Sequence, residues 1–217
     1  MNNPKEELEK LKQGIRKFRL EVYPQRADMY AKAAKVPQEP GTLFITCADS
    51  RIDPLEITSS GVGEIFVTRN IGNLVPGYGE MLGGVTAVIE FAIIALKVKH
   101  VVICGHSDCG AMKALLDPES VTTMPTVKSW MTNAHAALSI TETFRKLEID
   151  NCHKRPLKEV LTEQNVLLQM QHLKTHPSVA GAMAAGELSV SGWVYNIGEG
   201  NVYIAEDGQR SFTRLEP

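Results

Sequence analysis

The chain has 217 residues, enough for one domain with a substantial core and too few for two full domains. Its 23 Lys and Arg residues against 25 Asp and Glu residues give a net charge of -2, which excludes the strongly basic surface of a nucleic-acid-binding protein. The first residues are charged from Lys5 onward, and the longest apolar stretch, residues 84–98, is too short to cross a bilayer. We therefore expect a cytoplasmic protein with no membrane or nucleic-acid partner, and we assign residues 1–217 to a single domain.

An amphipathic helix is predicted at the N-terminus. Its apolar residues recur every three or four positions and so share one face: Leu8, Leu11, Ile15, Phe18 and Val22. Pro24, or the later Pro37 and Pro40, is expected to end this helical arm, which we assign to residues 1–35. The apolar face needs a surface to cover, and either its own domain or a second subunit would supply one.

Short runs rich in Val, Ile and Phe predict the strands of a parallel sheet. Runs at 42–46, 64–68 and 100–104 have the composition of strands buried on both faces. The helical stretch 84–98 joins the second run to the third, which makes a β-α-β unit with a right-handed crossover. Further helices are predicted at 110–116, 125–148 with a break, 156–175 and 177–186, followed by a strand at 188–196 and its hairpin partner at 201–205. The fold class is therefore α/β, with a mostly parallel central sheet of about four strands plus an edge strand, flanked by helices.

Residues able to bind a metal follow two of these strands. Cys47 comes at the end of the first strand, and His106 and Cys109 come after the third. Ligand sites in parallel sheets form at the carboxyl ends of strands where the strand order reverses, so these residues converge if the two strands are neighbours. Two thiolates and an imidazole suit zinc, and three protein ligands leave one position for water, as in a catalytic site. Asp49 is a further possible ligand, unless Arg51 pairs with it and holds it beside the metal.

Other features of the sequence have simpler interpretations. Cys104 and Cys152 are expected to be buried core residues. Gly105 and Gly110 have the spacing of a phosphate-binding loop, but the Lys and Ser or Thr that such a loop requires are absent. The glycine-rich segment 77–84 lacks the spacing of a dinucleotide-binding turn.

The two motifs CADSR at 47–51 and HSDCG at 106–110 resemble those of the beta-class carbonic anhydrases of bacteria and plants. The likeness continues through EIFVTRNIGNLVP and HPSVAGAMAAGELSVSGWVYNI and covers nearly all of residues 36–206. It implies a lyase that hydrates CO2 reversibly to bicarbonate and a proton by attack of a zinc-bound hydroxide. It also implies one Zn2+ per subunit, held by Cys47, His106 and Cys109, with Asp49 and Arg51 as a catalytic dyad.

The resemblance further implies a substrate pocket built across a dimer interface, in a protein that assembles as a dimer or a multiple of dimers. The plant-like branch has Gln, Phe and a small aliphatic residue where this chain has Gln38, Phe66 and Ile71. The backbone amide of Gly110 would face the substrate. Phe91 stands where the plant enzymes have Tyr, so one hydroxyl contact is lost.

Two features of the resemblance favour a zinc site that is open to water. A second branch of the family closes its zinc with the Asp and has Trp where this chain has Phe44. Gln38 matches the open branch instead. Hydrolysis of CS2 or COS at the same site is an alternative activity, and a structural zinc module with Asp49 as its fourth ligand is an alternative of a different class.

Overall fold

The computed structural model of the chain describes residues 3–80 and 83–216. The chain divides into two compact units, Met1–Gln38 and Glu39–Pro217, and each is described by itself. The boundary is close to the predicted end of the helical arm at residue 35, whereas the assignment of all 217 residues to one domain stays a prediction. Residues 81 and 82 of the glycine-rich segment lie outside the described residues. Within the described part of the chain, no helix combines the length and the hydropathy needed to cross a bilayer.

The N-terminal unit is helical over almost its whole length. Helix α1 (Pro4–Lys17) continues through a π-helical turn, η1 (Phe18–Val22), into α2 (Tyr23–Ala33). Asn3 caps α1, because its side chain accepts a hydrogen bond from the Lys5 amide while Glu6 bonds back to the Asn3 amide. Pro24 lies in the first turn of α2, where its missing N–H is tolerated. The arm therefore passes Pro24 and ends at Ala33, ahead of the later prolines.

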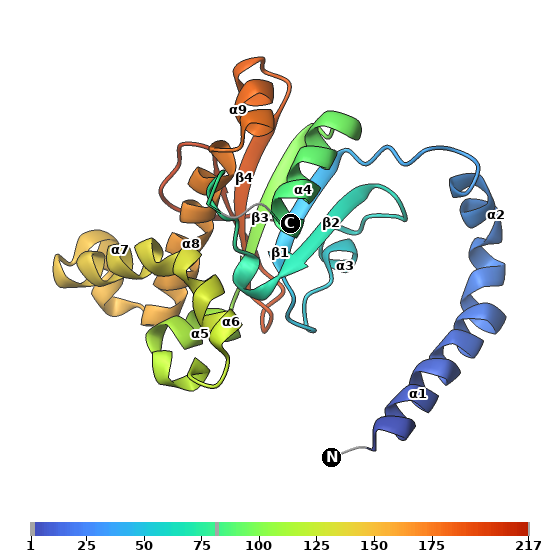
Figure 1. Cartoon of the computed structure of the whole chain (residues 1–217), viewed down its shortest axis with the longest axis horizontal. Coiled ribbons are helices and arrows are strands. Elements are labelled where there is room, and N and C mark those ends of the chain that lie inside the picture. The colour runs from blue at the N-terminus through green and yellow to red at the C-terminus, as the bar shows by residue number, and fades with distance from the viewer. Residues whose placement is uncertain (1–2, 81–82, 217) are drawn as a thin grey trace. The chain divides into compact units, whose positions relative to one another are not determined.

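The second unit is built on a six-stranded sheet in the order β2-β1-β3-β4-β5-β6. Figure 1 labels the first four of these strands, β2, β1, β3 and β4, side by side. Four parallel strands, β1 (Thr42–Cys47), β2 (Ile65–Asn70), β3 (His100–His106) and β4 (Ser189–Tyr195), form its main part. The antiparallel strands β5 (Val202–Glu206) and β6 (Thr213–Arg214) complete it. The predicted α/β class and mostly parallel sheet are thus confirmed. The prediction missed β6, because two residues carry no periodic pattern.

The helices of this unit follow the predicted order. They comprise α3 (Pro54–Thr58), η2 (Ile71–Asn73), α4 (Gly84–Glu90) with its π turn η3 (Phe91–Ala95), α5 (Gly110–Leu116), η4 (Pro118–Val121), α6 (Pro125–Trp130), η5 (Met131–Ala134), α7 (His135–Lys146), η6 (Ile149–Lys154), α8 (Leu157–Lys174) and α9 (Pro177–Ala184). The break predicted within 125–148 is the 3-10 turn η5. The short α3 was not predicted, since five residues are too few to show a helical period.

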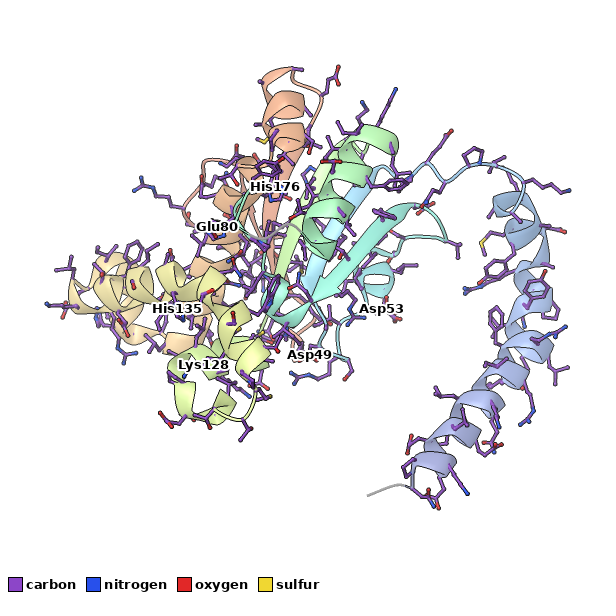
Figure 2. The ribbon with its side chains drawn as sticks, in the orientation of Figure 1. Asp49, Asp53, Glu80, Lys128, His135 and His176 are labelled. Carbon is purple, nitrogen blue, oxygen red and sulfur yellow. The ribbon has the colours of Figure 1, made fainter. Side chains whose placement is uncertain are left out.

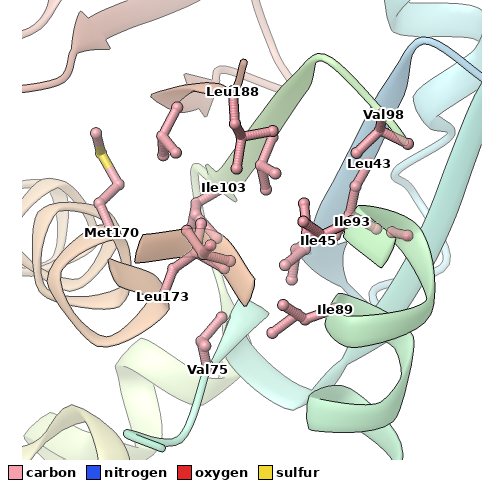
Figure 3. Packing of buried hydrophobic residues seen from close by; sticks show 14 of the residues in the cluster. Leu43, Ile45, Val75, Ile89, Ile93, Val98, Ile103, Met170, Leu173 and Leu188 are labelled. Carbon is pink, nitrogen blue, oxygen red and sulfur yellow. The ribbon is translucent and has the colours of Figure 1, made fainter. Parts of the chain in front are cut away.

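The main core lies between one face of the sheet and the helices α4, α8 and α9 (Figure 3). Leu43 and Ile45 of β1 and Ile103 of β3 point into it, and side chains such as Ile89 and Leu173 meet them from the helices. Because side chains alternate along a strand, Phe44, Val102 and Cys104 pack on the opposite face. Cys104 and Cys152 are both buried, as predicted.

Helix α8 packs closely against the sheet at two glycines. A Cβ atom on Gly192 of β4 would lie 2.6 Å from Met170 Sδ and from Val166 Cγ1, and one on Gly105 of β3 would lie 2.8 Å from Val166 Cγ2. Both neighbours belong to α8, so no side chain larger than hydrogen fits at these points. The glycines therefore set how closely the helix approaches the strands that lead to the site.

We expect Gly192→Ala to lower the free energy of unfolding by about 1–3 kcal/mol, because the added methyl group overpacks this contact. Urea unfolding at a fixed protein concentration measures the change. Gly181→Ala in α9 is the matched control, because its Cβ would meet nothing within 4 Å. That variant should gain up to about 1 kcal/mol from higher helix propensity. Equal stability of Gly192→Ala and the unaltered protein would contradict the close packing.

Candidate metal centre

The ends of two neighbouring strands bring the predicted ligands together. Cys47 is the last residue of β1 and His106 is the last residue of β3. The two strands pair in parallel, with Thr46 opposite Cys104, so their carboxyl ends are adjacent. The chain continues to β2 on one side of this pair and to β4 on the other, so the strand order reverses here. The expected convergence at a point of strand reversal is therefore confirmed.

A tight turn then places the second cysteine. Asp108 has a φ of +60°, a left-handed conformation that Asp adopts more readily than most residues. Cys109 follows it as the N-cap of α5. The Ser107 amide donates to the Tyr195 carbonyl and the Ser107 hydroxyl accepts from the Ile197 amide, which ties the turn to the end of β4. As a result, the Cys109 and Cys47 sulfur atoms lie 3.9 Å apart and form no disulfide.

The ligand atoms of Cys47, His106 and Cys109 all lie within 4.8 Å of one another, and all three residues are buried. Tetrahedral zinc with Zn–S bonds of about 2.3 Å separates two sulfurs by about 3.8 Å. The observed sulfur separation of 3.9 Å is close to that value. Among residues 3–80 and 83–216, this is the only group of three or more His, Cys, Asp or Glu side chains that meets the geometry for a metal ion.

His106 shows the clearest sign of a missing partner. Its Nδ1 lies 2.8 Å from the Ser107 carbonyl, which can only accept a hydrogen bond, so Nδ1 carries the proton. Nε2 therefore has a free lone pair, and it is buried without a hydrogen-bond partner. A buried, unpaired acceptor costs free energy. A metal ion between Nε2 and the two sulfurs would remove that cost, so the donor set fits zinc.

The two thiols differ in acidity. The Cys109 thiol hydrogen-bonds the Cys47 sulfur and lowers the Cys47 pKa, and His106 and the Gly72 and Asp49 amides act in the same direction against the effect of burial. The same Cys47 sulfur, together with burial, raises the pKa of Cys109. The metal-free pair therefore keeps one proton between two sulfurs. A metal ion that binds both as thiolates must displace it.

We therefore expect zinc retention to fall as the pH falls. Protons compete with the metal for sulfur, so a fall in pH favours the protonated thiols over the metal-bound thiolates. Dialysis against metal-free buffer at a series of pH values, followed by elemental analysis, measures the effect. Circular dichroism at each pH checks that the chain stays folded. A zinc content that is independent of pH down to the point of unfolding would contradict the expectation.

Asp49 and Arg51 form a bidentate ion pair beside the cluster. Arg51 Nε donates to Asp49 Oδ1 at 2.9 Å, and Nη2 donates to Oδ2 at 2.7 Å. These bonds hold the pKa of the Asp49 carboxyl well below its usual range. Asp49 Oδ2 lies 3.9 Å from His106 Nε2 and so faces the cluster. Figure 2 shows Asp49 beyond the carboxyl end of β1. Arg69 of β2 secures this segment by donating to the carbonyls of Cys47 and Asp49.

The predicted pocket residues fall into two groups. Ile71 follows Asn70, which pairs with Cys47, and Gly110 follows Cys109, so both are next to the cluster. Gly110 is the first residue of α5, where a backbone amide has no partner within the helix. Gln38 is the exposed last residue of the N-terminal unit, and its role stays a prediction.

Phe66 and Phe91 form the second group, away from the cluster of their own subunit. Their ring centroids are 6.1 Å apart, and Phe91 is 49% exposed. Phe66 pairs with Leu43, four residues before Cys47 on β1, which corresponds to roughly 13 Å along a strand. The structure of a single chain thus does not bring these rings to the metal ligands.

His172 and His176 belong to no group of metal-binding side chains among the residues that the structure describes. His172 Nδ1 bonds the Val75 carbonyl at 2.8 Å, and His176 Nε2 bonds the Pro76 carbonyl at 3.0 Å. His176 is buried and lies well away from Asp49 in Figure 2. Both rings are held by backbone, which is a structural role.

A family model described as carbonic anhydrase matches residues 42–202. The solved structure of the beta-carbonic anhydrase CcaA superposes with a TM-score of 0.86 at 36% identity, over 98% of this chain and 93% of that one. This chain belongs to the beta-class carbonic anhydrases. A carbonic anhydrase of Synechococcus elongatus is 46% identical over 199 residues, which cover 90% of this chain and 70% of the relative. A tetrameric beta-carbonic anhydrase of Sordaria macrospora superposes with a TM-score of 0.78 at 27% identity, over 96% of this chain and 99% of that one.

Beta-class carbonic anhydrases use zinc, and this one has a Cys-His-Cys cluster suited to the ion. Sequence reasoning missed three residues around it. Arg69 has no feature in the sequence that distinguishes it from other strand residues. Asp108 lies inside the HSDCG motif, but no role was assigned to it. Trp130 packs against the buried cluster that contains Cys47 and Cys109, and its indole N–H donates to the Ile71 carbonyl at 2.8 Å across 59 positions of sequence. Of these three residues, only Asp108 could have been singled out from the sequence, because a charged residue between two metal ligands needs a partner of opposite charge.

Proposed function

We propose that this carbonic anhydrase carries out the reversible hydration of CO2 to bicarbonate and a proton at the Cys47–His106–Cys109 cluster. The observation that carries the proposal is the buried Nε2 of His106, which lacks a hydrogen-bond partner and lies beside two sulfurs at zinc-like separation. Three protein ligands leave a fourth coordination position for a reactant, as catalytic zinc sites require. The chemistry that zinc supplies when bound is activation of water for attack on an electrophilic carbon.

Asp49 has the role of a fixed hydrogen-bond acceptor. Its Oδ2 faces the cluster and is ionised, so it can accept a hydrogen bond from the O–H of the attacking oxygen and orient the lone pair of that oxygen toward the carbon of CO2. Arg51 keeps Asp49 ionised and occupies both of its oxygens, which disfavours Asp49 as a fourth metal ligand. This arrangement also argues against a structural zinc module, which needs a closed set of four protein ligands.

Substrate binding needs apolar walls with a small number of donors. Ile71 and the Gly110 amide lie beside the cluster, and the amide is placed to donate to a bicarbonate oxygen. Phe66 and Phe91 are too far from their own cluster, so they serve a cluster only if two chains associate. We therefore propose a pocket across a dimer interface, in a dimer or a multiple of dimers, with Gln38 as a further donor.

The relative from Sordaria macrospora is tetrameric. The exposed apolar face of α1 is a further surface that association would cover.

We place the enzyme in the cytoplasm. None of the four cysteines, all of which lie in the described part of the chain, forms a disulfide. Free thiols persist in the reducing cytoplasm and are oxidised in secretory compartments. Fractionation of the native organism with an antibody against the protein tests the assignment.

Stopped-flow CO2 hydration with the purified protein, before and after zinc removal by a chelator, tests the proposed function. We expect catalysis that is lost with the metal and restored by zinc. A zinc-loaded, folded protein that does not accelerate hydration would exclude the proposal. COS and CS2 offered to the same preparation decide the alternative activity, because a hydrolase on this site would consume them faster than it hydrates CO2.

A further inference from the structure

Asp108 lies between two metal ligands, and the roles described above do not use it. Its carboxylate meets three cations from three different parts of the fold. Arg51 Nη1 is 3.3 Å from Oδ2, Lys113 Nζ of α5 is 2.7 Å from Oδ1, and Lys158 Nζ of α8 is 3.5 Å from Oδ1. The left-handed backbone of Asp108 places its carbonyl 3.4 Å from Arg51 Nη2 as well. One residue thus contacts Arg51 through both its side chain and its backbone.

The Arg51 guanidinium is consequently held on two edges. One edge pairs with Asp49, in the segment that follows Cys47. The other edge meets Asp108, in the turn that joins His106 to Cys109. A planar guanidinium bound on two edges cannot rotate without breaking one set of bonds. Arg51 therefore connects the two segments that carry the three metal ligands.

We propose, on the basis of the proposed function, that Asp108 is a positioning residue for CO2 hydration that holds Arg51 in place and so keeps Asp49 out of the metal's open coordination position. Asp49 Oδ2 is only 3.9 Å from His106 Nε2, so it would lie close to an ion held by the cluster. Arg51 keeps Asp49 from binding that ion only while its own orientation is fixed. Lys113 and Lys158 hold the other Asp108 oxygen and so fix the carboxylate itself.

The exposure of these groups separates a positioning role from a structural one. The side chains of Arg51 and Asp108 are 46% and 41% exposed. Ion pairs this exposed contribute little to folding stability, because water screens them. Loss of the Asp108 charge should therefore leave the fold and the bound zinc intact while it frees Arg51 to move.

The test compares Asp108→Asn with the unaltered zinc enzyme. Asn has nearly the same shape and also tolerates the left-handed backbone, so only the charge is lost. We expect kcat to fall by about 10- to 100-fold, as for other residues that position groups around a metal, with KM little changed. Zinc content and melting temperature should stay the same. Asp207→Asn is the matched control: it removes the charge of a carboxylate that is 36% exposed and pairs with Lys174 at 2.6 Å, after β5 and outside the metal-binding group, and its kcat should change by about twofold or less.

Two further measurements decide whether Asp108 acts through Arg51. In the Arg51→Gln background, adding Asp108→Asn should cause no further loss of kcat, since the group that Asp108 holds is already absent. In the cobalt-substituted proteins, azide should change the visible spectrum of the unaltered protein by entering the open position, and this response should weaken in Asp108→Asn as Asp49 enters that position.

Additive losses in the double variant, an unchanged kcat and azide response in Asp108→Asn, or loss of its zinc would each overturn the proposal. The cobalt spectra do not depend on turnover. A protein without any hydration activity would therefore remove the proposed function and still leave the Asp108 inference to be decided by the azide response.

Discussion

Replacement of Cys109 by alanine should remove both the metal and the activity. The Cys109 sulfur is one of three ligand atoms, and its residue is 2% exposed. Two remaining ligands hold zinc far more weakly than three. We expect the purified variant to contain little zinc and to hydrate CO2 at the uncatalysed rate, as measured by elemental analysis and stopped-flow assay.

Cys152→Ala is the matched control for this experiment. Cys152 is also buried and forms no disulfide, but it lies in η6 and outside the cluster. Its loss should leave a cavity that lowers stability without affecting zinc content. Stoichiometric zinc together with normal hydration in Cys109→Ala would rule out the assigned ligand set.

Replacement of Arg51 by glutamine should lower kcat by about 10- to 100-fold while zinc stays bound. Glutamine cannot make the paired bonds to Asp49, so the carboxylate loses both its orientation and the charge that stabilises its ionised form. The pH dependence should change as well. Arg51 lowers the pKa of Asp49 in the native enzyme, so Asp49 stays ionised at mildly acid pH. In the variant, Asp49 should protonate near the ordinary value of about 4, and the acid limb of the kcat profile should move to higher pH.

Arg214→Gln provides a control of the same geometry. Arg214 Nε and Nη2 donate to the two carboxylate oxygens of Glu216, two residues away as Asp49 is from Arg51, but in the edge strand β6. Its removal should leave kcat and the pH profile unchanged. If both arginine variants were equally active, Arg51 would have no part in the mechanism.

The metal centre was largely predictable from sequence because it depends on where strands end. Cys47 and His106 close two runs of buried strand residues, and neighbouring parallel strands must then present them together. Cys109 is only three residues after His106, so their proximity does not depend on how the rest of the chain folds. A site built from strand ends and one short turn is therefore visible without coordinates.

The contacts that hold the site in place could not be predicted in this way. The Trp130 bond to Ile71 and the Lys158 contact to Asp108 join residues 59 and 50 positions apart. Such contacts depend on how α6 and α8 pack, and no periodicity in the sequence reports packing angles. Similarly, the sequence predicted a strand at Phe66, and the family resemblance implied that Phe66 lies in the pocket. Only the pairing of Phe66 with Leu43, four residues before Cys47, shows that the ring is distant from the metal ligands of its own chain.

The hydrogen bond that fixes the protonated nitrogen of His106 goes to the peptide carbonyl of residue 107 rather than to any side chain. Amino-acid replacement cannot delete a main-chain oxygen. The tautomer needed for metal binding is therefore protected against point mutation as long as the turn keeps its path. Libraries that vary position 107 can alter the attachment of this loop to β4 while the imidazole keeps the same nitrogen available to the metal.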